Sequence, residues 1–339
     1  MVAIKVLDAD QSEDYGKEND ILKTLRAKQH KHLINLLASF QMGNKYHLVF
    51  PYADSNLRQY WEQQPNPVFD SLTVLWALEQ MRGIACGTNV IHEFRASIPL
   101  APAEGFRFKD GAKLSVAKDE VLFGRHGDLK PENILWFDDP ETDAPHKGNL
   151  KIADFGLGRF HGRDSRSNVD PVLARASPTY EPPECRMRIP VSRKYDIWSL
   201  GCIYLEFITW LLEGDKHITV FSEARGEPGA DGIDEDKFFT VIPMGERQPR
   251  VVIRKGVVDW AIRLHTHSKC SALIHMLIDM TMNKLLVVDP KNRATAAQVQ
   301  ILLTDALMKS KSDQVYLLRP APASRNRGHD NMAHEAPPT

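Results

Sequence analysis

Three polar residues between positions 128 and 133 have the chemistry needed to move a phosphoryl group. Asp128, Lys130 and Asn133 directly precede the apolar run 134–137. Phosphoryl transfer requires a carboxylate that orients the attacking hydroxyl, a cation near the moving phosphate and an oxygen ligand for Mg²⁺. These three side chains supply one of each. A second carboxylate, Asp154, follows further along the chain and could complete a metal site with the Asn133 amide.

Length, composition and charge describe an ordinary globular protein. The chain has 339 residues, of which 42% are hydrophobic and 26% are charged. These values are typical of folded proteins and leave room for one large domain or two lobes. The formal net charge of −1 gives no reason to expect nucleic acid or an anionic membrane as a partner.

Targeting and cysteine patterns favour an intracellular protein, in the cytoplasm or the nucleus. The N-terminus lacks the basic, apolar and small-residue pattern of a signal peptide. The four cysteines form no Cys-x-x-Cys pair, which favours reduced thiols over a disulfide framework or a zinc site. The most apolar run, 197–212, contains Glu206 and falls short of the roughly 20 residues that cross a bilayer. We therefore expect it to form a buried helix, with no membrane contact.

The first 50 residues predict a small sheet and one helix. Residues 1–7 are apolar and β-branched, which predicts a buried strand, but Lys5 interrupts them. A buried lysine needs an anion, because an unpaired ammonium is costly to bury. Glu18 lies on the apolar face of the helix expected at 13–29, so we predict that it pairs with Lys5. Two further strands, joined by a Gly-Asn turn, are expected at 33–41 and 45–50.

The remaining residues predict a larger, mainly helical region. Besides the run at 197–212, apolar residues at helical spacing predict helices at 55–64, 72–94, 271–287 and 295–308. A short strand pair is expected at 134–137 and 150–153. Glycine, proline and mixed charges predict a surface insertion at 95–123 and loops with only short helices at 214–250. Prolines and small polar residues from Arg319 onward predict disorder.

Several motifs resemble those of eukaryotic protein kinases of the serine/threonine class. The catalytic loop of these kinases is similar to 128–133, and Asp154-Phe155-Gly156 resembles their metal-binding loop. Val-Ala-Ile-Lys at 2–5 resembles the strand whose lysine contacts ATP. The resemblance implies an α+β, two-lobed protein kinase-like fold. Its parts would be a β-rich N-lobe of about three strands and one helix at 1–52, a mainly helical C-lobe at 54–308 that contains the insertion 95–123, and a disordered tail at 309–339.

The resemblance also implies a reaction and its cofactors. The γ-phosphoryl group of ATP would pass to a Ser or Thr hydroxyl of a protein substrate, with Mg²⁺ bound. Asp128 would orient that hydroxyl and accept its proton, and Lys130 would neutralise charge on the transferring group. Asn133 and Asp154 would ligate Mg²⁺.

Both lobes would contribute to the ATP site that the resemblance implies. Lys5, positioned by Glu18, would hold the α- and β-phosphates. Phe50 would gate the pocket behind the adenine. The other implied ATP-binding residues are Ala3, Pro51, Ala53 and Leu135.

Four further positions match family features that shape the substrate loop and the catalytic loop. Ser177 stands where a hydroxyl residue touches the catalytic Asp and Lys. Glu184 would form a buried ion pair with Arg293. Asp196 would hold the backbone of the catalytic loop through hydrogen bonds from N–H groups.

Two departures from the family pattern leave other interpretations open. No Gly-x-Gly-x-x-Gly occurs in the first 50 residues, where the family places the loop that covers the ATP phosphates. Gly127 stands where many members carry an arginine that binds a phosphate on the activation segment. The alternative hypothesis is therefore a pseudokinase or scaffold module with weak or no catalysis. A small-molecule kinase is disfavoured by the substrate loop that ends at Glu184. The protein substrate, the pathway and the oligomeric state stay open.

Overall fold

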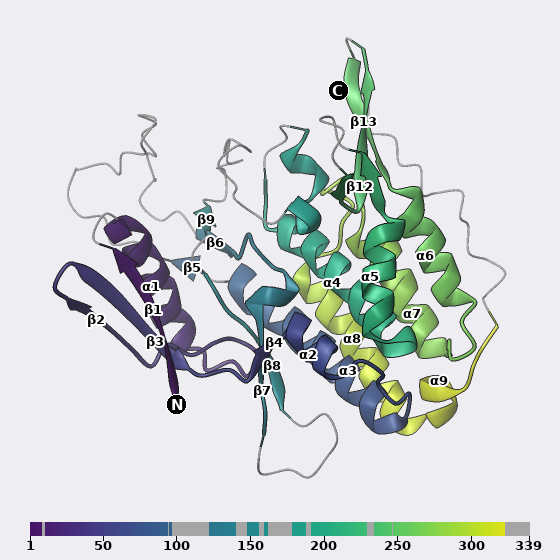
Figure 1. The fold of residues 1–339 in the computed structure, drawn as a ribbon, viewed down its shortest axis with the longest axis horizontal. Helices are drawn as coiled ribbons and strands as arrows, with labels where there is room; N and C mark the ends of the chain where they lie inside the picture. The colour runs from purple at the N-terminus through teal and green to yellow at the C-terminus, as the bar shows by residue number, and fades with distance from the viewer. Residues whose placement is uncertain are drawn as a thin grey trace.

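The computed structural model of this protein describes residues 1–8, 11–93, 95–96, 122–139, 148–155, 159–161, 178–187, 191–228, 234–245 and 247–322. A small sheet with one helix lies at one end of the long axis, beside a larger and mainly helical part (Figure 1). This mixture of helices and several small sheets agrees with the expected α+β class.

The N-terminal sheet has three antiparallel strands in the order β1-β3-β2. The strands are β1 (Val2–Asp8), β2 (Ala38–Met42) and β3 (Lys45–Pro51), and helix α1 (Ser12–Arg26) packs beside β1 and β3. Burial alternates along β1, so Val2, Ile4 and Val6 are about half exposed. The expected buried strand is therefore only half buried, because β1 is an edge strand with one face covered.

The segment before β2 does not form a strand from residue 33 as predicted. The N–H of Ile34 donates to the Ile152 carbonyl and the N–H of Ile152 donates to the His32 carbonyl, each at 2.9 Å. Leu33 is 4% exposed, and its side chain lies against Gly87 in the helical part. The apolar residues at this point are thus buried against another part of the protein instead of extending the N-terminal sheet.

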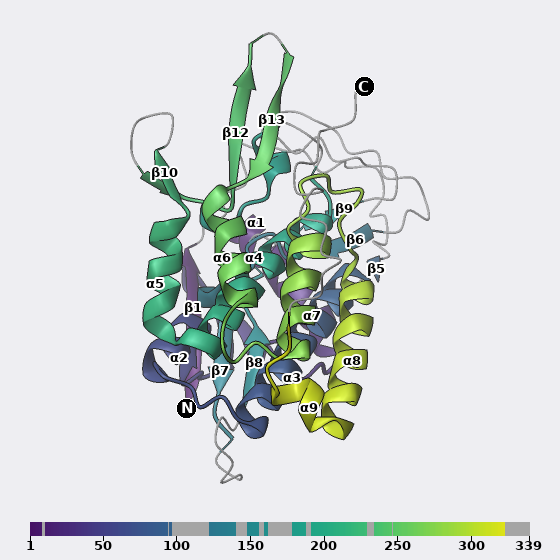
Figure 2. The same ribbon diagram turned by 90° about the vertical axis from the view of Figure 1, so that its right-hand side faces the viewer.

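Helix α4 (Lys194–Glu213) forms the centre of the helical part. Every residue from 195 to 212 is buried, which confirms the predicted buried helix. No helix within the described ranges is both long and apolar enough to span a bilayer. Further helices surround it: α2 (Leu57–Gln63), α3 (Ser71–His92), α5 (Asp215–Ala224), α6 (Lys255–His265), α7 (Ala272–Met280) and α8 (Ala296–Ser312) (Figures 1 and 2). A π-helical turn at Thr281–Leu285 follows α7.

Two small sheets flank the loop 126–130. One has the order β5-β6-β9 and contains β5 (Arg95–Ala96), β6 (Leu122–Arg125) and β9 (Arg159–His161). The other has the order β4-β7-β8 and contains β4 (Ser55–Asn56), β7 (Ile134–Phe137) and β8 (Asn149–Ile152). The loop runs from β6 to a 3₁₀ turn at Pro131–Asn133 and then into β7, so its two ends are anchored in different sheets. The predicted strand pair β7–β8 is present, whereas residues 97–121 of the predicted insertion lie outside the described residues.

Residues 214–250 are more regular than the loops predicted for them. They contain α5, the strand pair β10 (Gly226–Pro228) and β11 (Asp234–Asp236), and most of a hairpin formed by β12 (Phe239–Met244) and β13 (Arg247–Ile253). The hairpin projects from the helical part in both views (Figures 1 and 2). The prediction failed because glycines mark the junctions between these elements. Gly214 begins α5 with a φ of 88°, and Gly245 turns the hairpin with a φ of 66°.

The prediction that the chain is disordered from residue 309 onward is wrong for residues 309–322. Helix α8 continues to Ser312, and α9 (Gln314–Leu318) follows, with the Asp313 side chain accepting a hydrogen bond from the Tyr316 N–H at its start. Leu317 is fully buried, and Pro320 pairs with Ser271 in an isolated bridge. One well-placed apolar side chain therefore anchors a segment whose composition is polar. Residues 323–339 lie outside the described residues.

Candidate active site

The carboxylate of Asp196, at the start of α4, organises the loop that carries Asp128. Its two oxygens accept hydrogen bonds from the N–H groups of His126 (2.9 Å) and Gly127 (2.8 Å), the contacts predicted for it. His92 Nε2 lies 2.8 Å from the same carboxylate. Although burial favours the neutral acid, hydrogen bonds from His92 and Gly127 hold the pKa of Asp196 below its usual value. Gly127 has a φ of 82°, in the left-handed region that favours glycine.

Asp128, Lys130 and Asn133 form one hydrogen-bonded group within this loop. The Asn133 amide donates to the Asp128 carbonyl at 2.8 Å and to Asp128 Oδ2 at 2.9 Å. Lys130 Nζ lies 2.9 Å from the same Oδ2. Because the amide nitrogen of Asn133 is committed to Asp128, its amide oxygen is the atom that could bind a cation.

Asp154 is placed next to this group by the backbone. The N–H of Ala153 donates to the Asn133 carbonyl, and the Ala153 carbonyl is 2.9 Å from His126 Nε2. Asp154 itself has a φ of 61°, an uncommon conformation for a residue with a Cβ atom. Strained backbone of this kind persists where the surroundings impose it, and it concentrates at functional sites. Phe155 is buried beside the His126 ring, with 5.1 Å between ring centroids.

Lys5 joins the N-terminal sheet to this site. Its ammonium lies 2.8 Å from Glu18 Oε2, the predicted contact, and 2.9 Å from Asp154 Oδ1. Burial alone would lower the pKa of Lys5, but the carboxylates of Glu18 and Asp154 outweigh it and raise the pKa above its usual value. A permanently charged ammonium is thus held between a buried acid on α1 and a half-exposed acid after β8.

The predicted ion pair between Glu184 and Arg293 is also present. The two guanidinium nitrogens of Arg293 donate to the two carboxylate oxygens of Glu184 at 2.9 and 3.0 Å, with both side chains fully buried. Arg293 further donates to the carbonyls of Val287 and Lys194. This contact fixes the 3₁₀ turn at Pro183–Cys185 to the loop before α8.

The loop 126–130, Asp154 and helix α4 all lie within one segment that matches a known protein family. The model of the protein kinase domain matches residues 124–301, more than half of the chain. This protein belongs to the protein kinase family.

Curated relatives share part of the sequence of this protein. It is 25% identical over 205 residues to human "Cyclin-dependent kinase-like 5". This alignment covers 60% of this chain and 17% of that protein. It is 27% identical over 191 residues to mouse "Cyclin-dependent kinase-like 4", with 56% of this chain and 42% of the relative covered. Mouse "Homeodomain-interacting protein kinase 4" is 29% identical over 213 residues, with 61% and 28% covered. The chain therefore spans less than half the length of these relatives.

The residues predicted to bind adenine lie in β1, at and just after the end of β3, and in β7. Ala3 pairs with Phe50 between β1 and β3, and Pro51 ends β3. Ala53 follows, and the N–H of the next residue, Asp54, donates to the Trp136 carbonyl in β7. Leu135, which directly precedes Trp136, is half buried. Ser177, the predicted substrate-loop residue, lies outside the described residues.

A buried charge network around Glu206, which the sequence did not predict, lies behind the 3₁₀ turn at Pro178–Tyr180. Glu206 Oε2 accepts hydrogen bonds from the Tyr180 hydroxyl (2.9 Å) and from Arg58 (3.2 Å). Glu206 Oε1 accepts one from Arg225 at 2.8 Å, and Arg225 also binds Asp236. One feature of the sequence did indicate such a network: Glu206 is an acid inside the most apolar run. Such an acid requires cations around it, which had to come from distant helices.

The oxygen atoms around residue 133 fit a magnesium ion. Mg²⁺ prefers oxygen ligands and is usually bound by one or two carboxylates together with phosphates. The Asn133 amide oxygen and the Asp154 carboxylate are such ligands, and the backbone bond between Ala153 and Asn133 brings their chain segments together. A carboxylate has two oxygens, so Asp154 has the capacity to bind a cation and Lys5 together.

Proposed function

We propose that this kinase transfers the γ-phosphoryl group of ATP to Ser or Thr hydroxyls of protein substrates. The observation that supports the proposal most strongly is a series of contacts that joins Asp128 to Asn133, Asn133 to Ala153 directly before Asp154, and Asp154 to Lys5. In the proposed site, these residues would supply a hydroxyl-orienting acid, two metal-binding side chains and a phosphate-binding cation.

Each residue has a role that follows from its chemistry and its contacts. Asp128 accepts a hydrogen bond from the substrate hydroxyl and takes its proton as the oxygen attacks the γ-phosphorus. Lys130, 2.9 Å from Asp128, neutralises charge on the transferring phosphoryl group. Lys5 binds the α- and β-phosphates, and Glu18 holds its ammonium in place.

Magnesium would be held by the Asn133 amide oxygen and the Asp154 carboxylate. When bound, it would neutralise negative charge on the β- and γ-phosphates. Asp196 acts as a positioning residue, because it binds the loop backbone one and two residues before Asp128 and is itself fully buried.

The proposed organisation is a two-lobed kinase domain with an N-lobe at 1–52 and a C-lobe that begins at residue 54. Ala3, Pro51, Ala53 and Leu135 would line the adenine site between them. Ser177 would contact Asp128 and Lys130 from the substrate loop. The four cysteines are free thiols, which supports an intracellular location in the cytoplasm or nucleus.

Phosphoryl transfer from radiolabelled Mg-ATP to a mixture of basic proteins tests this proposal. We expect Asp128→Asn to remove most of the turnover while Mg-ATP still raises the melting temperature. Asp154→Asn should lose both turnover and the magnesium-dependent part of the shift. Asp259→Asn, which changes an exposed acid on α6, serves as the matched control and should behave as wild type.

The thermal shift separates catalysis from binding. A ligand at a hundredfold excess over its Kd stabilises the native state by about 2.7 kcal/mol, which is readily measured. Equal turnover by wild type and Asp128→Asn would refute the catalytic role. A wild-type protein that binds Mg-ATP but transfers no phosphate would be a binding module with the kinase fold.

A further inference from the structure

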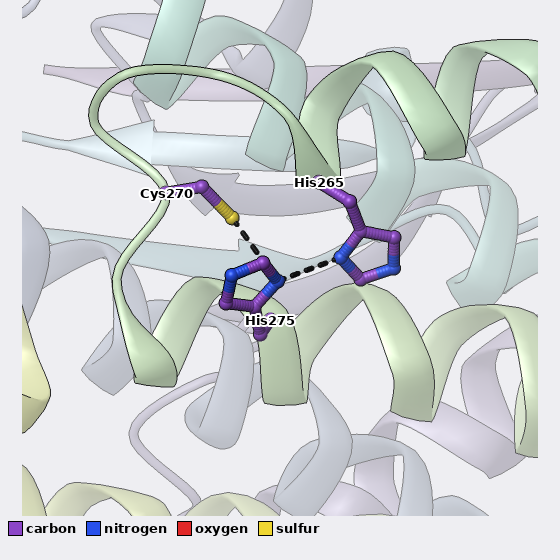
Figure 3. A group of neighbouring side chains, drawn as sticks. All are labelled: His265, Cys270 and His275. Atoms are coloured by element: carbon purple, nitrogen blue, oxygen red, sulfur yellow. Dashed lines mark hydrogen bonds between the residues drawn. The ribbon is translucent and has the colours of Figure 1, made fainter. Parts of the chain in front are cut away.

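A second group of chemically reactive side chains lies in the helical part. His265 ends α6, Cys270 lies in the link to α7, and His275 lies in α7 (Figure 3). Figure 3 shows the two imidazoles and the thiol turned toward one another. Their candidate ligand atoms all lie within 4.8 Å of one another, and within the described residues this is the one such group of three. None of the three takes part in the proposed phosphoryl transfer.

The outer contacts of the two histidines determine which ring nitrogens carry protons. His275 Nε2 lies 2.8 Å from the Ala321 carbonyl, which can only accept, so this nitrogen carries the hydrogen. His265 Nε2 lies 3.3 Å from the Asp279 carboxylate, which favours a hydrogen there as well. In the neutral rings the two Nδ1 atoms are then both acceptors, yet they lie 2.8 Å apart. Two facing lone pairs at this distance repel, and a cation bound between the two nitrogens would remove the repulsion.

The thiol of Cys270 identifies the kind of cation. Its Sγ lies 3.4 Å from His275 Nδ1, and the side chain is 1% exposed. Two imidazoles and one thiolate suit Zn²⁺, which binds nitrogen at about 2.0 Å and sulfur at about 2.3 Å in a tetrahedron. These bond lengths place sulfur and nitrogen ligands about 3.5 Å apart and two nitrogen ligands about 3.3 Å apart. The 3.4 Å from Sγ to His275 Nδ1 is close to this value, whereas the two Nδ1 atoms would separate by about half an ångström.

We propose that His265 Nδ1, Cys270 Sγ and His275 Nδ1 bind a zinc ion, with water as the fourth ligand. The contacts to Asp279 and Ala321 match those that orient metal-binding histidines, which donate their other N–H to a carboxylate or a backbone carbonyl. Binding releases the thiol proton of Cys270, because the thiolate is the ligand. The His265 side chain is 9% exposed, so the group reaches solvent on that side.

The zinc ion would fasten the C-terminal segment to the helical part. The Ala321 N–H donates to the Cys270 carbonyl at 3.0 Å, and Pro320 pairs with Ser271. Together with the His275–Ala321 contact, these bonds join residues 320–321 to the end of the α6–α7 link and to α7 itself. A metal that fixes the two imidazoles therefore also fixes the acceptor at Ala321.

Metal analysis of the untagged full-length protein tests the proposal. After dialysis against a chelator, the protein is titrated with Zn²⁺, and with Co²⁺ as a spectroscopic probe of thiolate ligation. We expect one ion per chain, a cobalt–thiolate absorption band, and a zinc-dependent rise in melting temperature. Mg²⁺ should produce neither the band nor the rise through this site, because it prefers oxygen ligands.

Three variants separate a zinc site from a chance cluster. Cys270→Ser should remove both the band and the bound zinc, with circular dichroism confirming that the chain still folds. Asp279→Asn leaves all three ligands in place and should weaken zinc binding by about 10- to 100-fold. Cys86→Ser is the matched control, because Cys86 Sγ lies 3.1 Å from His30 Nε2 in a pair that belongs to no three-ligand group among the described residues. It should leave zinc binding unchanged.

Two results would overturn the proposal. One is wild-type protein that holds less than about one ion per chain at saturating zinc, which would mean that a proton alone bridges the imidazoles. The other is a cobalt–thiolate band that survives Cys270→Ser but disappears in Cys86→Ser.

Discussion

Asp196 and His92 form a buried pair, with 2.8 Å between the carboxylate and Nε2. The same carboxylate accepts two N–H groups from the loop before Asp128, so one side chain determines the path of that loop. Replacement by Asn keeps the shape but turns an NH₂ group toward one of these N–H donors. We expect Asp196→Asn to lower the free energy of unfolding by about 1–3 kcal/mol, the cost of a buried unsatisfied group.

Urea denaturation and steady-state kinetics together check the prediction for Asp196. Because Asp196 positions the loop and is fully buried, kcat should fall with little change in KM for ATP. Unchanged stability and kcat would contradict it, with Asp259→Asn as the surface control.

The Glu184–Arg293 pair should be costly to break from one side. Both side chains are fully buried, so removal of one leaves an uncompensated charge, at a cost of about 3–5 kcal/mol. Glu184→Ala and Arg293→Ala should each destabilise by this amount, measured by chemical denaturation. The double variant should lose much less than the sum of the two, and strict additivity would show that the residues are not coupled.

Gly83 in α3 should not tolerate even a methyl group. A Cβ atom built at this position lies 2.1 Å from Nε2 of His32, whose buried ring is held by the Leu150 carbonyl at 2.8 Å. Gly83→Ala should therefore destabilise the protein by about 1–3 kcal/mol. Gly16→Ala in α1 is the matched control, because no neighbouring atom of the described residues lies within 4 Å of its Cβ position. The control should be stabilising by about 0.5–1 kcal/mol. Equal effects at both sites would contradict the crowding at His32.

His32 should make the protein sensitive to mild acid. Burial, together with the nearby Lys31 and Arg82, lowers the pKa of His32 to about 4, although the hydrogen bond to Leu150 opposes the shift. The unfolded chain, with the ordinary pKa of about 6.5, binds the proton first, so stability is lost as the pH falls from 6.5 to 4. The loss should approach 3 kcal/mol, on the order of 1.4 kcal/mol for each unit of pKa shift.

Denaturation at a series of pH values measures the contribution of His32. His32→Gln should show a smaller fall in the free energy of unfolding over this range than wild type. Parallel curves would mean that other groups cause the acid sensitivity.

Local patterns predicted much of the fold and of the candidate site. The apolar run at 197–212 fills the centre of the helical part as α4. Lys5 and Glu18, each polar on an apolar surface, do meet, because a buried charge requires a partner wherever the chain can supply one. Asp196 and the loop before Asp128 also meet as expected, although they are distant in sequence.

What could not be predicted depends on contacts between distant segments. Arg58 and Arg225 both bind Glu206, but no spacing in the sequence connects these two arginines. The cysteine pattern was examined for Cys-x-x-Cys pairs, so the spacing of Cys270 five residues from both His265 and His275 was overlooked. Residues 214–250 were misassigned because their composition is dominated by the turns and not by the strands between them.

The two hydrogen bonds of Ile152 have a mechanical consequence for the whole molecule. Its N–H and carbonyl bind residues 32 and 34, so the chain leading into β2 is attached to the edge of β8 in the other part of the protein. A rotation of the N-terminal sheet about residues 32–34 can keep these two bonds, whereas sliding along β8 would break them. Lys5 belongs to the N-terminal sheet and Asp154 follows β8 in the other part of the protein. Such a rotation would therefore change the 2.9 Å distance between Lys5 Nζ and Asp154 Oδ1.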